Sequence, residues 1–191
     1  MLAQALQKTG RNQEAAAELR AAQQQTEAQK NKEVAAALNN EGTKLLASGR
    51  SEEAAGKLQE AVRLNPEDPL AQYNYGVALL LQNKVDDAIR QLQTALRLKS
   101  DDPDTRYYLG RAFLAKGEDR EAAASLREAA RLAPDDARAH NALGVALAGV
   151  GSFKEAEAEI RAACKMDPGN ALFAENLACV QTRSQKCTLA P

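Results

Sequence analysis

The sequence has few of the residues from which active sites are usually built. It contains no tryptophan and a single histidine, His140, among its 191 residues, and aromatic residues make up 4% of it. A catalytic triad, a histidine metal site or a histidine general base would all have to use this one residue. We interpret His140 as a packing residue of a helix. We therefore expect no enzymatic activity, no catalytic residue, no metal site and no cofactor.

The chain also has no large excess of charge of one sign and no long apolar run. Lys and Arg together number 25 against 26 for Asp and Glu, so the formal net charge is −1. This balance does not support a broad phosphate-binding surface, and we expect no nucleic-acid partner. No apolar run is long enough to span a bilayer, and the start MLAQALQKTG lacks the basic and apolar regions of a signal peptide. We expect a soluble chain of unknown compartment, with the cytoplasm as the default.

The three cysteines show neither the spacing of a metal site nor a disulfide framework. Cys164 lies in an apolar column of a predicted helix, where we interpret it as a small buried hydrophobic residue. Cys179 and Cys187 could close a short loop in an oxidising compartment, and this alternative stays open.

What the sequence does contain is a repeat with a step of 34 residues. The segment 137–170 shows one unit, with amphipathic helices predicted over 141–150 and 154–166 and a turn at Gly151. Four columns keep the step, and they are Gly42, Gly76, Gly110 and Gly144; Ala54, Ala88, Ala122 and Ala156; Leu58, Leu92, Leu126 and Ile160; and Ala61, Ala95, Ala129 and Ala163. Asn83 stands where other units have glycine at the turn, and asparagine tolerates the left-handed region.

A period of about 34 residues with two helices per unit is typical of tetratricopeptide repeats. The chain resembles this family over most of its length. The resemblance implies an all-α fold, a right-handed α-solenoid of helix-turn-helix units that stack because two helices alone cannot bury their apolar stripes. We expect four full repeats at 35–68, 69–102, 103–136 and 137–170, with half units at both ends.

The ends of the chain depart from the regular period. Residues 1–22 resemble a partial N-terminal unit, and 23–34 form a polar connector of strong helix formers. We expect one helix, or two with a slight bend, from Asn12 to about Ser48; a flexible linker is the alternative. The apolar stripe of the partial unit then needs another surface, which suggests a homo-oligomer, and its residues are Leu2, Leu6, Ala15, Leu19 and Ala22. Residues 171–183 should form a capping helix and 184–191 a disordered tail.

The family resemblance implies a non-catalytic module that binds a peptide or protein partner in the concave groove of the array. The stripe that should line this groove consists of Tyr73, Asn74, Val77, Leu81, Tyr107, Tyr108, Arg111, Arg138, Asn141 and Val145. We expect the tyrosines to supply rigid apolar area, Asn74 and Asn141 to hold a peptide backbone, and Arg111 to hold an acidic group. Truncating Tyr107 should then weaken binding and leave thermal stability nearly unchanged.

Two alternatives remain. In the first, the rings simply cover alanine-rich neighbours. In the second, the chain is a spacer or oligomerisation segment of a larger protein whose activity lies elsewhere. Some family members bind chaperone C-termini through a clamp of Lys, Asn and Arg. The corresponding positions here are Asn39, Thr43, Asn74, Asp104 and Tyr108, and only Asn74 matches. We therefore expect no clamp of this type.

Overall fold

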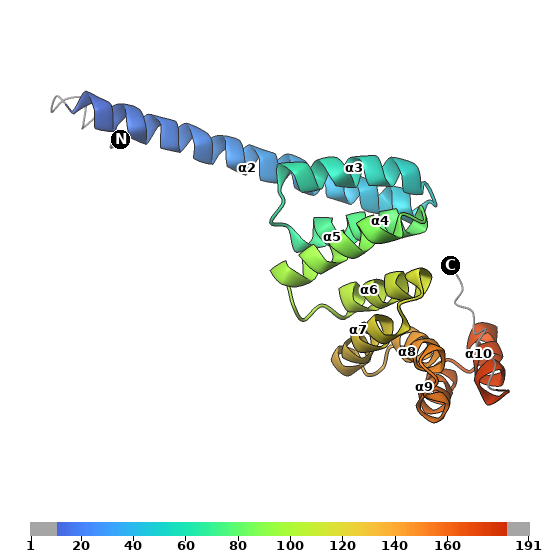
Figure 1. The fold of residues 1–191 in the computed structure, drawn as a ribbon. Helices are drawn as coiled ribbons and strands as arrows, with labels where there is room; N and C mark the ends of the chain where they lie inside the picture. The colour runs from blue at the N-terminus through green and yellow to red at the C-terminus, as the bar shows by residue number, and fades with distance from the viewer. Residues whose placement is uncertain (1–10, 183–191) are drawn as a thin grey trace.

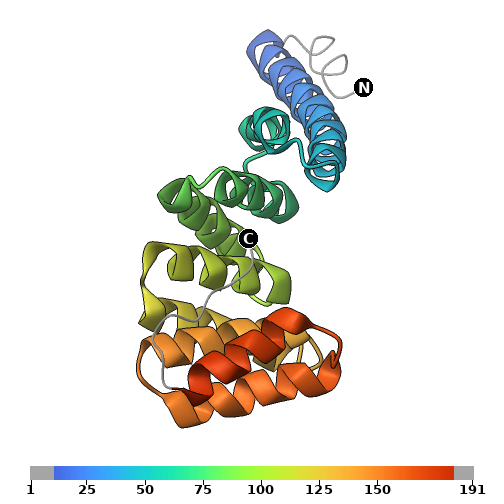
Figure 2. The same ribbon diagram turned by 90° about the vertical axis from the view of Figure 1, so that its right-hand side faces the viewer.

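The computed structural model describes residues 11–182, and this part of the chain is helical throughout, with no strand. Successive helices fold back on one another as hairpins, and the hairpins stack into an α-solenoid (Figure 1). Figure 2 shows that neighbouring hairpins are rotated relative to one another. The expected all-α fold is confirmed. The helices are α2 (Asn12–Ala47), α3 (Ser51–Leu64), α4 (Pro69–Leu81), α5 (Val85–Leu98), α6 (Pro103–Lys116), α7 (Asp119–Leu132), α8 (Ala137–Gly149), α9 (Phe153–Met166) and α10 (Ala171–Gln181).

Contacts in the array are local along the chain. Within a hairpin, α2 packs on α3, α4 on α5, α6 on α7 and α8 on α9, and each hairpin then packs on the next. The last helix, α10, covers α9 and α8, and its Val180 belongs to their apolar core. We call α4, α6, α8, α10 and the packed part of α2 the first helices, and α3, α5, α7 and α9 the second helices.

The glycine and leucine columns meet inside each hairpin. A Cβ atom added to Gly42, Gly76 or Gly110 would lie 2.5, 2.7 or 2.4 Å from the Cγ atom of Leu58, Leu92 or Leu126, and one added to Gly144 would lie 2.3 Å from Cγ1 of Ile160. These distances are shorter than any real Cβ contact, so only glycine lets the second-helix side chain approach this closely. The four partner side chains are fully buried. The repeat step therefore reproduces one packing contact four times.

The turns within hairpins use residues that tolerate a left-handed backbone, and the turns between hairpins end in residues that cap the next helix. Asn83 adopts φ 59°, in the left-handed region, where Gly49, Gly117 and Gly151 adopt 77°, 80° and 85°. The prediction for Asn83 is therefore confirmed. Between hairpins, three aspartates cap the first helices: Asp68 accepts from Leu70 N, Asp102 from Thr105 N and Asp136 from Arg138 N.

The first described helix is much longer than the others. Helix α2 has 36 residues, and Figure 1 shows its N-terminal part projecting beyond the stack. Between Asn12 and Val34 only Ala15 is buried, and regular burial begins at Ala35. The helix expected over the polar connector is present, while the division into a partial unit and a connector remains our interpretation. Leu2 and Leu6 of the predicted stripe lie outside the described residues.

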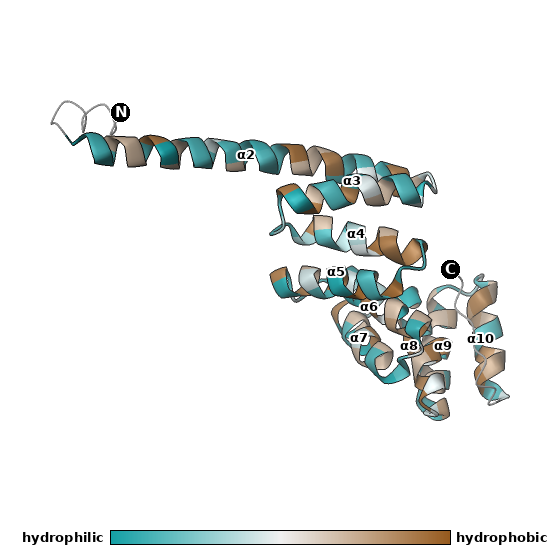
Figure 3. Cartoon of the chain, turned by 45° about the horizontal axis from the view of Figure 1, so that its top comes forward, coloured by the Kyte–Doolittle hydropathy of each residue, from teal (hydrophilic) through white to brown (hydrophobic). Residues whose placement is uncertain are grey.

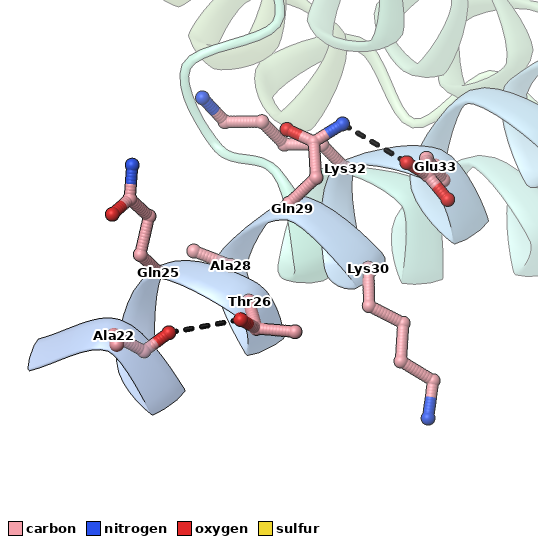
Figure 4. Close-up of a pocket in the computed structure, with 8 residues that line it drawn as sticks. All are labelled: Ala22, Gln25, Thr26, Ala28, Gln29, Lys30, Lys32 and Glu33. Atoms are coloured by element: carbon pink, nitrogen blue, oxygen red, sulfur yellow. Dashed lines mark hydrogen bonds between the residues drawn. The ribbon is translucent and has the colours of Figure 1, made fainter. Parts of the chain in front are cut away.

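Most residues in the projecting part of α2 are exposed, and some of their side chains form hydrogen bonds within the helix. Figure 3 shows mainly hydrophilic residues along it. In Figure 4 the side chains around Ala22 to Glu33 point away from the helix in several directions and line a shallow hollow. Thr26 Oγ1 donates to the carbonyl of Ala22 at 2.9 Å, and Gln29 Nε2 donates to Glu33 Oε1 at 3.0 Å. None of the helices between residues 11 and 182 combines the length and apolarity needed to cross a membrane.

Candidate protein-interaction surface

Three of the predicted site residues form a contiguous group of rings, which we call the tyrosine cluster: Tyr73 of α4 and Tyr107 and Tyr108 of α6. The ring centroids of Tyr73 and Tyr108 are 5.7 Å apart with an interplanar angle of 68°. Those of Tyr107 and Tyr108 are 5.2 Å apart at 75°. Both are edge-on arrangements, the geometry that aromatic pairs favour. The cluster therefore joins the second and third repeats through their first helices.

Two predicted arginines lie over these rings. The guanidinium carbon of Arg111 is 5.8 Å from the Tyr107 centroid and 5.7 Å from that of Tyr108. The corresponding atom of Arg138, on α8, is 5.1 Å from the Tyr107 centroid. These distances fall within the range of cation–π attraction. The structure thus brings five of the ten predicted residues into one group.

Arg138 is also held by two carboxylates. Its Nη2 atom lies 2.8 Å from Asp136 Oδ2 and 3.1 Å from Asp104 Oδ1 of the preceding repeat. The hydrogen bond with Asp136 raises the pKa of the guanidinium above its usual value. Partial burial favours the neutral Asp136 carboxyl, but the hydrogen bond and charge of Arg138 outweigh it and lower the pKa of that carboxyl. Arg138 therefore links the third and fourth repeats.

The rings of the tyrosine cluster are partly or fully buried, although residues that line a binding groove need exposed surface. Tyr107 is 9% exposed and belongs to the apolar core around α7 and α8. Burial raises the pKa of the Tyr73 and Tyr107 phenols, so both hydroxyls stay protonated near neutral pH. Because the Tyr107 ring fills volume in this core, we now expect its truncation to lower stability, contrary to the prediction from the sequence. Tyr108, which is half-buried, and Tyr73 are the accessible members of the cluster.

The two predicted asparagines lie between helices. Asn74 is 6% exposed and donates from Nδ2 to Asn39 Oδ1 at 2.8 Å and to Thr43 Oγ1 at 3.3 Å. Asn141 is 2% exposed and accepts at Oδ1 from Asn176 Nδ2 at 3.0 Å. We therefore assign Asn74 and Asn141 to the joints between repeats rather than to a peptide backbone. The first three clamp-equivalent positions also bond one another here.

Of the three remaining predicted residues, only Leu81 offers much exposed surface to a partner. Val77 and Val145 are buried, whereas Leu81, at the C-terminal end of α4, is 52% exposed. Neither valine can offer a partner much apolar area without a movement of the neighbouring helices.

A pocket that sequence reasoning missed lies beside Tyr73. Its volume is about 300 Å³, and it is lined by Pro69, Leu70, Tyr73, Ala95, Lys99, Asp102, Asp104 and Thr105. Leu70, one of these lining residues, is 55% exposed. Partial burial favours the neutral Asp102 carboxyl, but hydrogen bonds from Lys99 and Thr105 outweigh it and lower its pKa. Leu70 and Asp104 share the 34-residue column of Arg138, and this column could have revealed them.

The single histidine has a structural role. His140 Nε2 lies 3.1 Å from the carbonyl oxygen of Pro134, and its Nδ1 lies 2.6 Å from Glu159 Oε2. At the equivalent positions, Gln72 donates to Pro66 O at 3.0 Å and Arg106 to Ser100 O at 2.9 Å. The side chain in this column therefore holds the turn that precedes its own repeat, which agrees with our interpretation of His140 as a packing residue.

Two of the three cysteines, Cys164 and Cys179, lie within residues 11–182. Cys164 is a free thiol packed partly against the core. Cys187 lies outside the described residues, so its pairing with Cys179 stays a hypothesis. No group of three or more His, Cys, Asp or Glu side chains in the described range could hold a metal ion.

Comparisons with known proteins agree with this architecture. The sequence model of the tetratricopeptide repeat family matches residues 39–103, 82–123 and 107–171, together more than half of the chain. A search of curated proteins found no match.

Several solved structures are similar. MamA (41-end) from Desulfovibrio magneticus RS-1 has a TM-score of 0.71 and 26% identity, over 78% of this chain and 84% of that one. YrrB, described as a TPR protein with an unusual peptide-binding site, has a TM-score of 0.68 and 25% identity, over 81% and 79%. The first TPR of Spaghetti, bound to the HSP90 peptide SRMEEVD, has a TM-score of 0.58 and 18% identity, over 60% and 90%, a likeness of fold alone. With the 34-residue columns, the stacked hairpins and the family match in agreement, the chain belongs to the tetratricopeptide repeat family.

Proposed function

We propose that the chain is a non-catalytic interaction module whose first helices bind a peptide or protein partner. The observation that carries this proposal is the tyrosine cluster with Arg111 over two of its rings. Tyrosine and arginine are the residue types that most often dominate binding at protein interfaces. Regular packing of the array does not require them, because the first and fourth repeats place asparagines at the equivalent joints.

The comparisons support the same class of function. The similar protein YrrB is described as having a peptide-binding site, and the Spaghetti domain is bound to a peptide. The chaperone clamp of Lys, Asn and Arg does not explain binding here, since Asn39, Thr43 and Asn74 are bonded to one another. We propose instead that binding centres on the tyrosine cluster and the adjoining pocket, with no nucleic-acid partner and no catalysis.

A pair of tyrosines on one helix provides the test. A library of random peptides displayed on phage is selected against the full chain, and the enriched peptides are measured against Tyr73→Ala and Tyr75→Ala. Both residues lie on α4, but Tyr73 packs beside Tyr108 whereas Tyr75 packs against the separate core of α3. We expect Tyr73→Ala to weaken binding by about 1–2 kcal/mol or more, the scale of interface hot spots. Tyr75→Ala should have no comparable effect.

The result that would count against this site is equally specific. Equal losses for both variants would mean that general destabilisation, not a binding surface, explains the effect. Failure of any peptide to be enriched above an unrelated helical protein would remove the proposal.

The second candidate function is an oligomerisation or spacer segment. It is favoured by the projecting part of α2, where Leu19 is 46% exposed and Ala22 is also exposed. We propose that a second copy of the chain covers this stripe. Light scattering of the full chain and of Leu19→Glu tests it: the wild type should be larger than a monomer, and the variant should shift to monomer. A wild-type monomer at high protein concentration would refute it.

A further inference from the structure

We propose that copies of the chain assemble head to tail, with the projecting part of α2 of one copy packed on the open face of α10 of another. This inference rests on the second candidate function, in which a second copy covers the stripe around Leu19, and adds the surface that this copy uses. It is carried by two faces of the described chain, on its first and last helices, that match the two halves of a hairpin.

The open face of α10 is the side on which the first helix of every full repeat carries a second helix. In each full repeat the glycine of this side is buried against a leucine or isoleucine of the second helix. Ala178 follows Gly144 by the same 34 residues, but α10 contacts only α8 and α9 among the described helices. Ala171, Ala174 and Ala178, which share one side of α10, are all exposed. This side of α10 therefore lacks the helix that covers its counterparts.

The projecting part of α2 carries the apolar columns of a second helix. Ala15, Leu19 and Ala22 each lie 39 residues before a buried residue of α3, and these residues are Ala54, Leu58 and Ala61. Ala15 is already buried within one chain, whereas Leu19 is 46% exposed and Ala22 is exposed. In α3 the leucine of this column packs against the glycine of its first helix. The exposed stripe of α2 is therefore the complement that α10 lacks.

The match predicts which residues meet and how tightly. Leu19 of one copy would lie opposite Ala178 of another, as Leu126 lies opposite Gly110 within the chain. The Cβ atom of Ala178 occupies space that the leucine fills in the full repeats, so the two helices cannot approach as closely as within a hairpin. A single pair of helices also buries less area than a stable complex usually needs. We therefore expect the assembly to be reversible and to depend on protein concentration.

The length and polarity of α2 fit this arrangement. Residues 23–34, nearly all exposed, separate the stripe from the start of regular burial at Ala35 and span about 18 Å as a helix. This segment would stay in solvent between the two solenoids, so neither stack has to pack on the other. Because the contact joins two different faces, each complex keeps one free copy of each face. Further copies can therefore add, and complexes should grow beyond the dimer.

Complementation between two variants tests the pairing. Sedimentation velocity measures the wild type, Leu19→Glu, Ala178→Glu and an equimolar mixture of the two variants over a range of concentrations. We expect wild-type complexes to grow with concentration and each variant alone to stay monomeric. The mixture should form a dimer and nothing larger, because only one intact pair of faces remains.

Two further variants are matched controls. Ala17→Glu of α2 and Ala158→Glu of α9 introduce the same charge at exposed positions outside both faces, and both should assemble as the wild type does. Circular dichroism checks that every variant is folded. Loss of assembly in these controls would show a general effect of charge and would overturn the assignment of the two faces.

The outcomes separate this inference from the candidate function on which it rests. A dimer that Leu19→Glu abolishes and Ala178→Glu leaves intact would show that two α2 helices pair with each other, and would overturn the role of α10 alone. Two monomeric variants that stay monomeric when mixed would also overturn the contact between α2 and α10. A wild type that stays monomeric at high concentration, or complexes that neither variant disrupts, would overturn both.

Discussion

Asn74 donates a 2.8 Å hydrogen bond from its side-chain amide to Oδ1 of Asn39, which lies 35 residues earlier, one residue more than a full repeat. The same offset of 35 residues recurs between Tyr73 and Tyr108 and between Asn141 and Asn176. Each pair joins the first helix of one repeat to the first helix of the next. The chain therefore uses one geometric relationship for two kinds of contact: buried amide pairs near the ends of the array and an aromatic pair at its centre.

The Asn39–Asn74 pair should stabilise the first joint. We expect Asn74→Ala to cost about 1–3 kcal/mol, because it leaves Asn39 buried with fewer hydrogen bonds. The Asn39→Ala and Asn74→Ala double variant should lose less than the sum of the two single variants. Chemical unfolding of the four proteins measures this coupling, and the exposed neighbour Asn40→Ala serves as the control. Strict additivity would show that the bond contributes nothing.

Two glycines within helices, Gly110 of the glycine column and Gly56 outside it, predict opposite effects of substitution by alanine. Gly110→Ala places a Cβ atom 2.4 Å from Leu126 Cγ and should cost about 1–3 kcal/mol through overpacking. Gly56→Ala, within α3, meets no heavy atom within 4 Å and should stabilise by about 0.5–1 kcal/mol through helix propensity. Thermal melting of both variants tests the pair. A neutral Gly110→Ala would mean that Leu126 can move aside at little cost.

These columns show how much of the fold could be predicted from the sequence. The 34-residue recurrence of Gly110 and Leu126 reports a contact inside a hairpin, so it predicts helices, turns and stacking. The rotation between neighbouring hairpins leaves no such periodic signal. This rotation decides whether the Asn74 side chain faces a groove or the preceding first helix. It also decides whether the Tyr107 ring, which lies in a core that also contains Ala142, is buried or exposed. The members of the site could therefore be named, but their exposure could not.

The equivalence of His140 with Gln72 predicts which substitutions it tolerates. His140→Gln should keep the bond to the Pro134 carbonyl and change stability by less than about 0.5 kcal/mol. His140→Leu removes the donor and should cost about 0.5–1.5 kcal/mol. Thermal melting of the two variants makes the comparison. If glutamine were as damaging as leucine, the contact with Glu159 would be the important one.

The cap at Asp136 predicts a dependence of stability on pH. Its carboxyl has a lower pKa in the folded chain than normal, so it stabilises the fold above the unfolded pKa of about 3.9. That contribution is lost as the pH falls through the lower folded value. Asp136→Asn keeps a capping side chain without the charge. It should be less stable than wild type by up to about 1 kcal/mol at pH 7, and the difference should shrink as the pH falls through the folded pKa of Asp136.

Unfolding by urea at several pH values measures this difference. The exposed neighbour Asp135→Asn is the control and should show no comparable trend. A difference between wild type and Asp136→Asn that stays constant with pH would assign the effect to the cap alone.

The length of α2 gives the molecule a lever. Its projecting part, from Asn12 to Val34, spans about 33 Å at the rise of an α-helix, and regular burial begins at Ala35. A tilt of about 10° at that point displaces the far end by about 6 Å. Asn39 lies one helical turn beyond Ala35. A force applied near Asn12 would therefore act through a long lever arm on the hydrogen bond between Asn39 and Asn74.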